Sequence, residues 1–183
     1  LVPISYTISF APDAHGSVGL YQPQDSFHYG DRVILTFAPE KGYELSTVKV
    51  TDFAGNDVPL NNNYFSMPDS NVIVSGTFVP SEFEITLRYK GTGHYASVPS
   101  TARTGETVTI TSNPGYHLSD MMVTGEDATF IAHSSTPSKT LTFTMPPQNV
   151  TVLVNCSINF YYVYADVSDG GHITRLEDVI NQR

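Results

Sequence analysis

Apolar and polar residues alternate in short segments along most of the chain. Tyr6, Ile8 and Phe10 alternate with Thr7 and Ser9, and Val33, Leu35 and Phe37 alternate with polar or outward-facing neighbours in the same way. Successive side chains of a strand point to opposite faces, so each such segment predicts a strand with one apolar side. Turn-forming Gly, Pro, Asn and Asp separate the segments. The predicted strands of the first half cover residues 6–10, 17–21, 32–37, 48–50, 64–67 and 72–78.

One stretch of this pattern occurs twice. Phe65 is followed by Met67-Pro68 and Asn71-Val72, and Phe143 is followed by Met145-Pro146 and Asn149-Val150, 78 residues later. Proline lacks a backbone donor and ends regular strand pairing, so Met-Pro predicts the end of one strand. The asparagine is expected in the turn that follows, before the next strand restarts at valine.

Other positions repeat in the same order at offsets of 73 to 77 residues. The equivalent pairs are Tyr6 and Phe83, Ile8 and Ile85, Phe10 and Leu87, Gly16 and Gly93, Gly30-Asp31 and Gly105-Glu106, and Gly42-Tyr43 and Gly115-Tyr116. Because the offsets drift, insertions and deletions are expected in loops. Several matches in one order indicate an internal repeat. A third copy begins with Tyr161, Val163 and Gly171.

The repeat predicts an all-β chain of small tandem modules, β-grasp-like or sandwich-like, in an elongated arrangement. The expected divisions are 1–79 for the first module, 80–157 for the second, and 158–183 for a partial third repeat or a docked C-terminal tail. Residues 79–82 are expected to form a short linker, with each module touching only its neighbours. In the tail, a strand from about Phe160 to Val167 is expected to pack against another part of the chain.

The alternation also predicts which side chains are buried. Met67 and Met145 are expected in the cores, with Val72, Val74, Val150 and Val152 inward, and Ile73, Ser75, Thr151 and Leu153 outward. Cys156 aligns with Phe78 and is expected to be a buried, inert thiol. Tyr43 and Tyr116 repeat, so their rings are expected inside.

Composition narrows the function classes. The formal net charge of −9 makes phosphate backbones and anionic membranes poor partners, so neither nucleic-acid binding nor membrane insertion is expected. A single cysteine excludes an internal disulfide framework and a multi-cysteine zinc site. The chain shows no apolar run of membrane-spanning length.

No catalytic group emerges from the motifs. His133 beside Ser134 and Ser135 lacks a nucleophile elbow and is expected in a solvated loop. Asp120 is expected to be a solvated acid in a turn, and residues 52–57 an ordinary turn without the distal glutamate of a calcium loop. The six histidines, at positions 15, 28, 94, 117, 133 and 172, have no metal-ligand spacing. We therefore expect no catalytic residue, cofactor or metal, and the pattern assigns no binding residue.

Several tyrosines do not repeat and leave two interpretations open. They are Tyr21, Tyr29, Tyr89, Tyr95, Tyr161, Tyr162 and Tyr164. Such rings could pack within or between modules, or form an exposed patch for a sugar or protein ligand. The absence of tryptophan weakens the sugar interpretation.

The order of Gly-acid-x-Val, Gly-Tyr-x-Leu, Phe-x-Met-Pro and Asn-Val-x-Val over residues 5–157 resembles bacterial extracellular repeat modules, the divergent internalin-type B-repeats. The resemblance implies a non-catalytic protein at the bacterial surface or secreted, acting as a spacer, presentation or adhesion module. It implies host or cell-surface proteins, glycans or neighbouring repeats as partners. The alternative is a carbohydrate-binding accessory region of a larger glycan-degrading enzyme.

Overall fold

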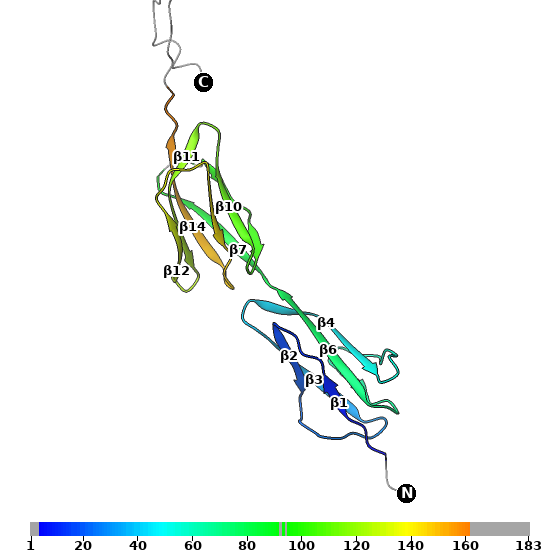
Figure 1. Cartoon of the computed structure of the whole chain (residues 1–183). Coiled ribbons are helices and arrows are strands. Elements are labelled where there is room, and N and C mark those ends of the chain that lie inside the picture. The colour runs from blue at the N-terminus through cyan, green and yellow to red at the C-terminus, as the bar shows by residue number, and fades with distance from the viewer. Residues whose placement is uncertain (1–3, 92, 94, 162–183) are drawn as a thin grey trace, which may run out of the picture.

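A computed structural model describes residues 4–91, 93 and 95–161. This part of the chain contains strands and no helix, in two halves (Figure 1). The strands of the first half are β1 Ile8–Phe10, β2 Gly16–Leu20, β3 Arg32–Pro39, β4 Tyr43–Asp52, β5 Tyr64–Ser66 and β6 Val72–Pro80. Those of the second half are β7 Glu82–Tyr89, β8 Ala96–Ser97, β9 Thr101–Arg103, β10 Thr107–Ser112, β11 Tyr116–Gly125, β12 Phe130–Ser134, β13 Thr140–Thr144 and β14 Val150–Ile158.

Each half forms a two-sheet module of the same topology. In module 1 one sheet has the order β1-β6-β4 and the other β2-β3-β5; module 2 repeats these orders as β7-β14-β11 and β8-β10-β13. The first strand pairs parallel with the last in both modules, Ile8 opposite Val72 and Ile85 opposite Val150. The prediction of an all-β chain is therefore confirmed, with a sandwich-like arrangement and the same strand order in both copies.

Module 2 extends its larger sheet at both edges. β12 pairs antiparallel with β11, and β9 with β7. Module 1 has isolated bridges at the same two places, Thr51 with Asp57 and Tyr6 with Phe27. The extra strands are thus longer versions of contacts that both copies share. The residues inserted in module 2 to form β12 fall where module 1 has a loop.

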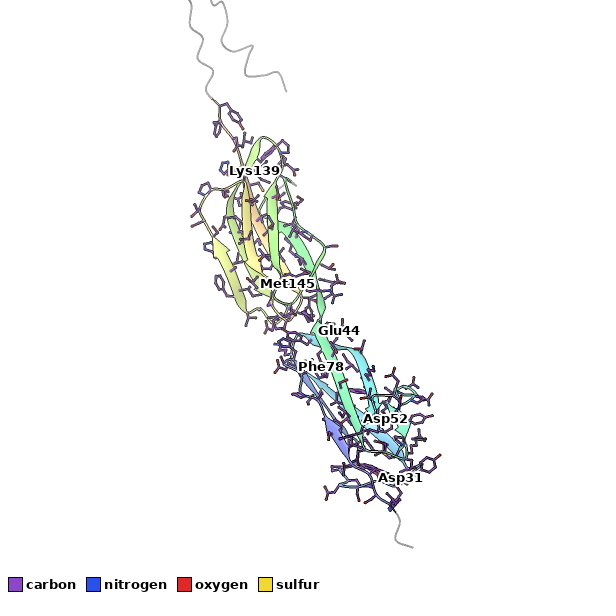
Figure 2. The ribbon with its side chains drawn as sticks, turned by 45° about the vertical axis from the view of Figure 1, so that its right-hand side comes forward. Asp31, Glu44, Asp52, Phe78, Lys139 and Met145 are labelled. Atoms are coloured by element: carbon purple, nitrogen blue, oxygen red, sulfur yellow. The ribbon has the colours of Figure 1, made fainter. Side chains whose placement is uncertain are left out.

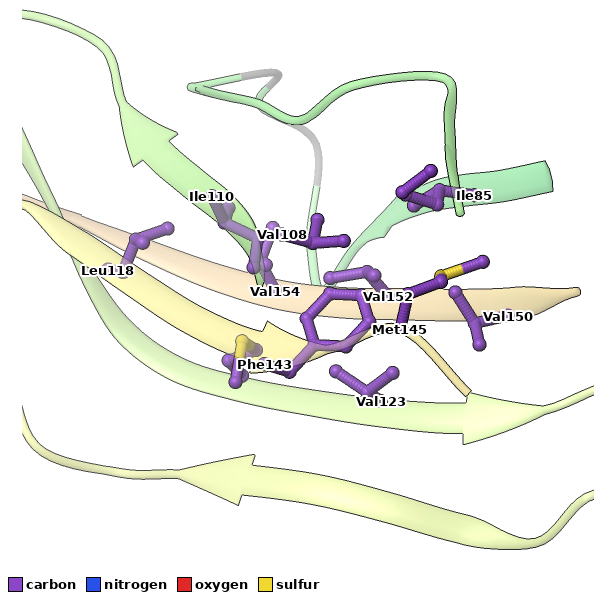
Figure 3. Close-up of a cluster of buried hydrophobic side chains, with 12 residues drawn as sticks. Ile85, Val108, Ile110, Leu118, Val123, Phe143, Met145, Val150, Val152 and Val154 are labelled. Atoms are coloured by element: carbon purple, nitrogen blue, oxygen red, sulfur yellow. The ribbon is translucent and has the colours of Figure 1, made fainter. Parts of the chain in front are cut away.

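The core of each module lies between its two sheets. In module 1 the buried cluster contains Phe27, Val33, Leu35, Val50, Phe65, Met67, Val72 and Val74. In module 2 it includes Ile85, Val108, Ile110, Leu118, Val123, Phe143, Met145, Val150, Val152 and Val154 (Figure 3). Burial of Met67 and Met145, and the inward register of the four predicted valines, are confirmed. Leu153 is half-buried and Val152 fully buried, also as predicted.

A Gly-acid turn fixes each buried methionine. The Met67 backbone donates to the Asp31 carbonyl at 2.8 Å and accepts from Gly30 N–H at 2.9 Å. Met145 makes the same pair of bonds with Glu106 and Gly105. Each glycine has a positive φ, +86° and +83°, which side chains disfavour. The repeated glycine therefore serves a backbone conformation that brings the Met-Pro strand end onto the turn.

Two packing predictions were wrong. Cys156 is half-buried rather than buried; it contacts the core cluster near the end of the sheet, where β14 leaves the sandwich. Tyr43 and Tyr116 are half-buried, because each ring stacks against another ring: Tyr43 on His15 at 4.0 Å and Tyr116 on Tyr95 at 3.9 Å.

The modules lie end to end, and β6 runs almost directly into β7 (Figure 1). β6 ends at Pro80 and β7 begins at Glu82, so Ser81 alone separates them. Figure 2 shows Glu44 and Phe78 at this end of module 1 and Asp31 near its opposite end. The predicted short connection and elongated arrangement are confirmed.

The predicted strand at about 160–167 falls mostly outside the described residues. Phe160 and Tyr161, which are described, lie beyond the end of β14 and are 87% and 75% exposed. Phe160 therefore does not begin a packed strand.

Candidate functional site

The predicted chemical residues of module 2 come together on its surface in a way that sequence reasoning missed. Asp120 lies in β11 and His133 in β12, not in a turn and a loop as predicted. Asp120 Oδ2 accepts from Lys90 Nζ at 2.6 Å, and His133 Nε2 lies 2.9 Å from Asp120 Oδ1. The hydrogen bond from Lys90, with its positive charge and a second bond from His133, holds the pKa of the Asp120 carboxyl below its usual value.

This network holds the edge of a sheet together. It joins residues on or next to β7, β11 and β12, across the inserted hairpin. The carboxylate orients the histidine, which is one half of a general-base arrangement, but the hollows found in the described part of the chain lie elsewhere, so no water-excluding cleft surrounds the pair. We interpret it as an ion-pair network on the module surface.

The other predicted candidates are structural as well. In residues 52–57, the Asp52 carboxylate accepts from Asn56 N–H at 2.8 Å and from Asn56 Nδ2 at 2.9 Å. These bonds lower the pKa of Asp52 and use its oxygens inside the turn. Within the described residues no group of three or more His, Cys, Asp or Glu side chains could hold a metal ion. His94 and His172 lie outside those residues.

Cys156 has the character of a weakly reactive thiol. Partial burial raises its pKa above the usual value, which lowers its thiolate fraction at neutral pH.

Ser112, which replaces Phe37 of the first copy, is 2% exposed, and its hydroxyl lies 2.9 Å from the Tyr116 carbonyl and 3.2 Å from the Lys139 carbonyl. Both differences between the copies, Ser112 in place of Phe37 and Cys156 in place of Phe78, concern packing.

The tyrosines divide between packing and exposure. The Tyr89 hydroxyl donates to the Ala96 carbonyl at 2.6 Å, and Tyr95 stacks on Tyr116. Tyr21 and Tyr29 of module 1 and Tyr161 are exposed. Tyr162 and Tyr164 lie outside the described residues.

A set of polar contacts lies at the joint between the modules. We use "joint" for the contacts of Gly42, Glu44 and Pro80 of module 1 and Ser81 with Arg103, Thr104 and Pro147 of module 2. Ser81 N–H donates to the Gly42 carbonyl at 2.8 Å, and Thr104 N–H donates to the Ser81 carbonyl at 3.0 Å. The connecting residue is therefore held from both modules.

Arg103 strengthens the same joint from module 2. Its Nη1 donates to the Pro80 carbonyl at 2.7 Å and lies 3.8 Å from Glu44 Oε1. The side chains of both charged residues are about half exposed, so the ion pair contributes on the order of 1 kcal/mol or less. Its fixed geometry orients one module against the other.

Gly42 is a point of close approach between the modules. A Cβ built there would lie 2.4 Å from the Pro147 side chain and 2.9 Å from Thr104 Oγ1, and φ is +88°. Sequence analysis found Gly42 as a repeated turn glycine but did not assign it to the joint. No sequence signal marks this role, because Gly42 lies beside the 79–82 connection only through the pairing of Tyr43 with Pro80.

A hollow lies at the opposite end of module 1. This end hollow is lined by Ile4, Tyr6, His28, Tyr29 and Asp69 and has a volume of about 490 Å³. Ile4 is 70% and Tyr29 73% exposed. The Tyr6 hydroxyl donates to Asp69, and this bond raises the pKa of Tyr6. The hollow thus combines exposed apolar surface with an ordered polar pair.

Comparison with protein families explains the repeat. Residues 6–82 and 83–160 each match the divergent InlB B-repeat domain. The chain belongs to this family. B-repeat domains are typical of extracellular proteins of bacteria, including surface proteins, and the comparison identifies these repeat domains and no catalytic domain. The resemblance inferred from the residue pattern is confirmed in both copies.

Searches among curated proteins and among solved structures found no match to the chain. The described part of the chain has no helix long and apolar enough to cross a bilayer.

Proposed function

We propose that these two B-repeats form a non-catalytic, stiff spacer that presents other parts of a surface-located or secreted bacterial protein, or takes part in adhesion. The observation that carries the proposal is the joint. A one-residue connection has both its backbone N–H and its carbonyl bound, one to each module. A flexible linker would leave these groups to water.

Two further contacts of the joint oppose bending. Arg103 bonds the Pro80 carbonyl, and Gly42 packs closely against Pro147. Each module has its own buried core, so each can remain folded while the strands β6 and β7 transmit force and span the distance between the two ends. Repeats that contact only their neighbours suit a spacer whose length scales with their number.

Residual dipolar couplings of the backbone amides test the stiffness directly. We expect the two modules of the full chain to share one alignment tensor, and the chain to scatter X-rays as a single elongated particle. Arg103→Ala should give the two modules different alignment tensors. Arg88→Ala in β7, away from the joint, is the control. Independent tensors in the unmodified chain would overturn the stiff-spacer function.

A second role, carbohydrate binding, has one observation in its favour. A shallow hollow on module 1 combines the exposed ring of Tyr21 with the polar groups of Gln22, Gln24 and Arg32. Planar rings beside amide and guanidinium donors suit sugar hydroxyls and apolar sugar faces. A glycan array with the full chain and with Tyr21→Ala tests this role; binding that depends on Tyr21 would support it, and an array without binding would remove it.

A further inference from the structure

The end hollow of module 1 occupies the same place in its module as the module 2 half of the joint. The repeat offsets of 75 to 78 residues pair His28 with Arg103 and Tyr29 with Thr104, and they pair Asp69 with Pro147. Ile4 takes the place of Ser81. The shared strand order makes these sequence matches matches in space as well.

In module 2 this face is covered. The turn around Gly42 packs against Pro147 and Thr104, and the Gly42 carbonyl accepts from Ser81. Among the described residues, the matching face of module 1 is open and carries two apolar side chains that are at least 70% exposed, Ile4 and Tyr29. Exposed apolar side chains that gather around a hollow indicate an interaction surface.

The local backbone of the open face is already in the form that the joint uses. The His28 N–H donates to Asp31 Oδ2 at 2.7 Å, as the Arg103 N–H donates to Glu106 Oε2 at 2.7 Å. The Asp31 N–H donates to the His28 carbonyl at 3.1 Å, as the Glu106 N–H donates to the Arg103 carbonyl at 3.0 Å. No rearrangement of this turn is needed before a module docks.

We propose that the end hollow is the receiving face of a second joint, and that its occupant is another repeat module of this fold, connected directly ahead of Ile4. The occupant is recognised by its Gly-Tyr turn. The glycine lies against Tyr29 and Asp69, as Gly42 lies against Thr104 and Pro147. An acidic residue after the tyrosine, placed as Glu44 is, faces His28. This inference rests on the stiff-spacer function and extends it to the surface of module 1.

The free end of module 2 supports the same geometry from the other side. The Asn159 N–H donates to the Gly115 carbonyl at 2.8 Å, as the Ser81 N–H donates to the Gly42 carbonyl at 2.8 Å. Among the described residues, a Cβ at Gly115 would meet nothing within 4 Å, although Gly115 has a positive φ of +82°, close to the +88° of Gly42. The Gly-Tyr turn, which is the half of the joint that Gly42 represents in module 1, is therefore formed before any module covers it.

A three-module chain tests the proposal: residues 1–80 placed directly before Ile4 of the chain 4–183. The Gly42 turn of the added copy then faces the end hollow. We expect all three modules to share one alignment tensor, and the nitration rate of Tyr29 in module 1 to fall at least several-fold relative to the unmodified chain. The natural joint is the internal control.

A double substitution in the original module 1, Tyr29→Asp with His28→Glu, should free the added module and leave the natural joint unchanged. An added module that tumbles independently, with Tyr29 nitrated as fast as before, overturns the proposal while the shared tensor of the two original modules keeps the stiff-spacer function. Glycan binding by the unmodified chain that is lost in Tyr29→Ala would instead make the hollow a sugar site and also overturn it. Loss of the common tensor at the natural joint would be a failure of the proposed function itself.

Discussion

The Asn71 side chain accepts a hydrogen bond from the backbone N–H of Thr7, 64 residues earlier in the chain, at 2.8 Å. Asn149 repeats this contact with the N–H of Glu84 at 2.9 Å. In both modules the asparagine after Met-Pro therefore binds the residue that directly precedes the first parallel pair between the first and last strands. This contact explains why the residue recurs.

Loss of that acceptor is expected to destabilise module 1. Asn71→Ala should lower the free energy of unfolding by about 0.5–1.5 kcal/mol, because the Thr7 N–H loses its partner at a partly exposed site. Chemical denaturation measures the change. Asn71→Asp retains an oxygen acceptor and should lose less; equal losses in the two variants would show that the bond to Thr7 is not the cause.

The buried methionines are expected to contribute more. Met67→Ala should cost about 2–5 kcal/mol, since the side chain is 1% exposed and its removal leaves a cavity. Met122→Ala, at a half-buried position of β11, is the control and should cost clearly less. Denaturant titration compares them; a loss under about 1 kcal/mol for Met67 would mean that Met-Pro marks a turn without supporting the core.

Gly42 and Gly115 form a matched pair for the joint. Both have positive φ, +88° and +82°, so alanine costs about 1–2 kcal/mol of backbone strain at either position. Only Gly42→Ala also pushes against Pro147 and Thr104. We expect similar losses of thermal stability, but a changed distance between spin labels on the two modules for Gly42→Ala alone. The same distance change in Gly115→Ala would contradict the role of Gly42.

Ala128 is expected to tolerate glycine with a gain in stability. It has φ +63°, and its counterpart in module 1 is Gly55 at +88°. Ala128→Gly should raise the free energy of unfolding by up to about 1 kcal/mol, because relief of strain exceeds the added entropy of the unfolded chain. The reverse change, Gly55→Ala, should destabilise module 1. Thermal melts measure both, and a destabilised Ala128→Gly would contradict the strain argument.

The Asp120 network predicts a pH dependence at acid pH. The pKa of Asp120 is lowered in the folded chain, so its contribution to stability is present above the unfolded-state pKa and is lost as pH falls through the lowered folded value. Lys90→Met should move the Asp120 pKa upward, more than His133→Gln, because the Lys90 hydrogen bond is the largest cause. Carboxyl carbon NMR measures these pKa values; an unchanged pKa in Lys90→Met would contradict the pairing.

The sequence by itself determined the fold class and much of the internal arrangement. Strand alternation fixed which valines face the core, because a one-residue slip would turn every apolar side chain to water. The recurrence of Phe-x-Met-Pro and Asn-Val identified two copies, because each unit needs the same turn and the same core positions.

Only the tertiary structure decided which residues meet across the chain. Asp120 and His133 came together because the inserted β12 pairs with β11. Gly42, Arg103 and Pro147 form one joint, although no local pattern connects them. Alternation and turn chemistry report on neighbours along the chain, whereas these contacts depend on how sheets and modules stack. The same reason hid the end hollow. In the sequence Tyr29 is one of several non-repeating tyrosines, and only the fold places it at the position that matches Thr104 of the joint in module 2.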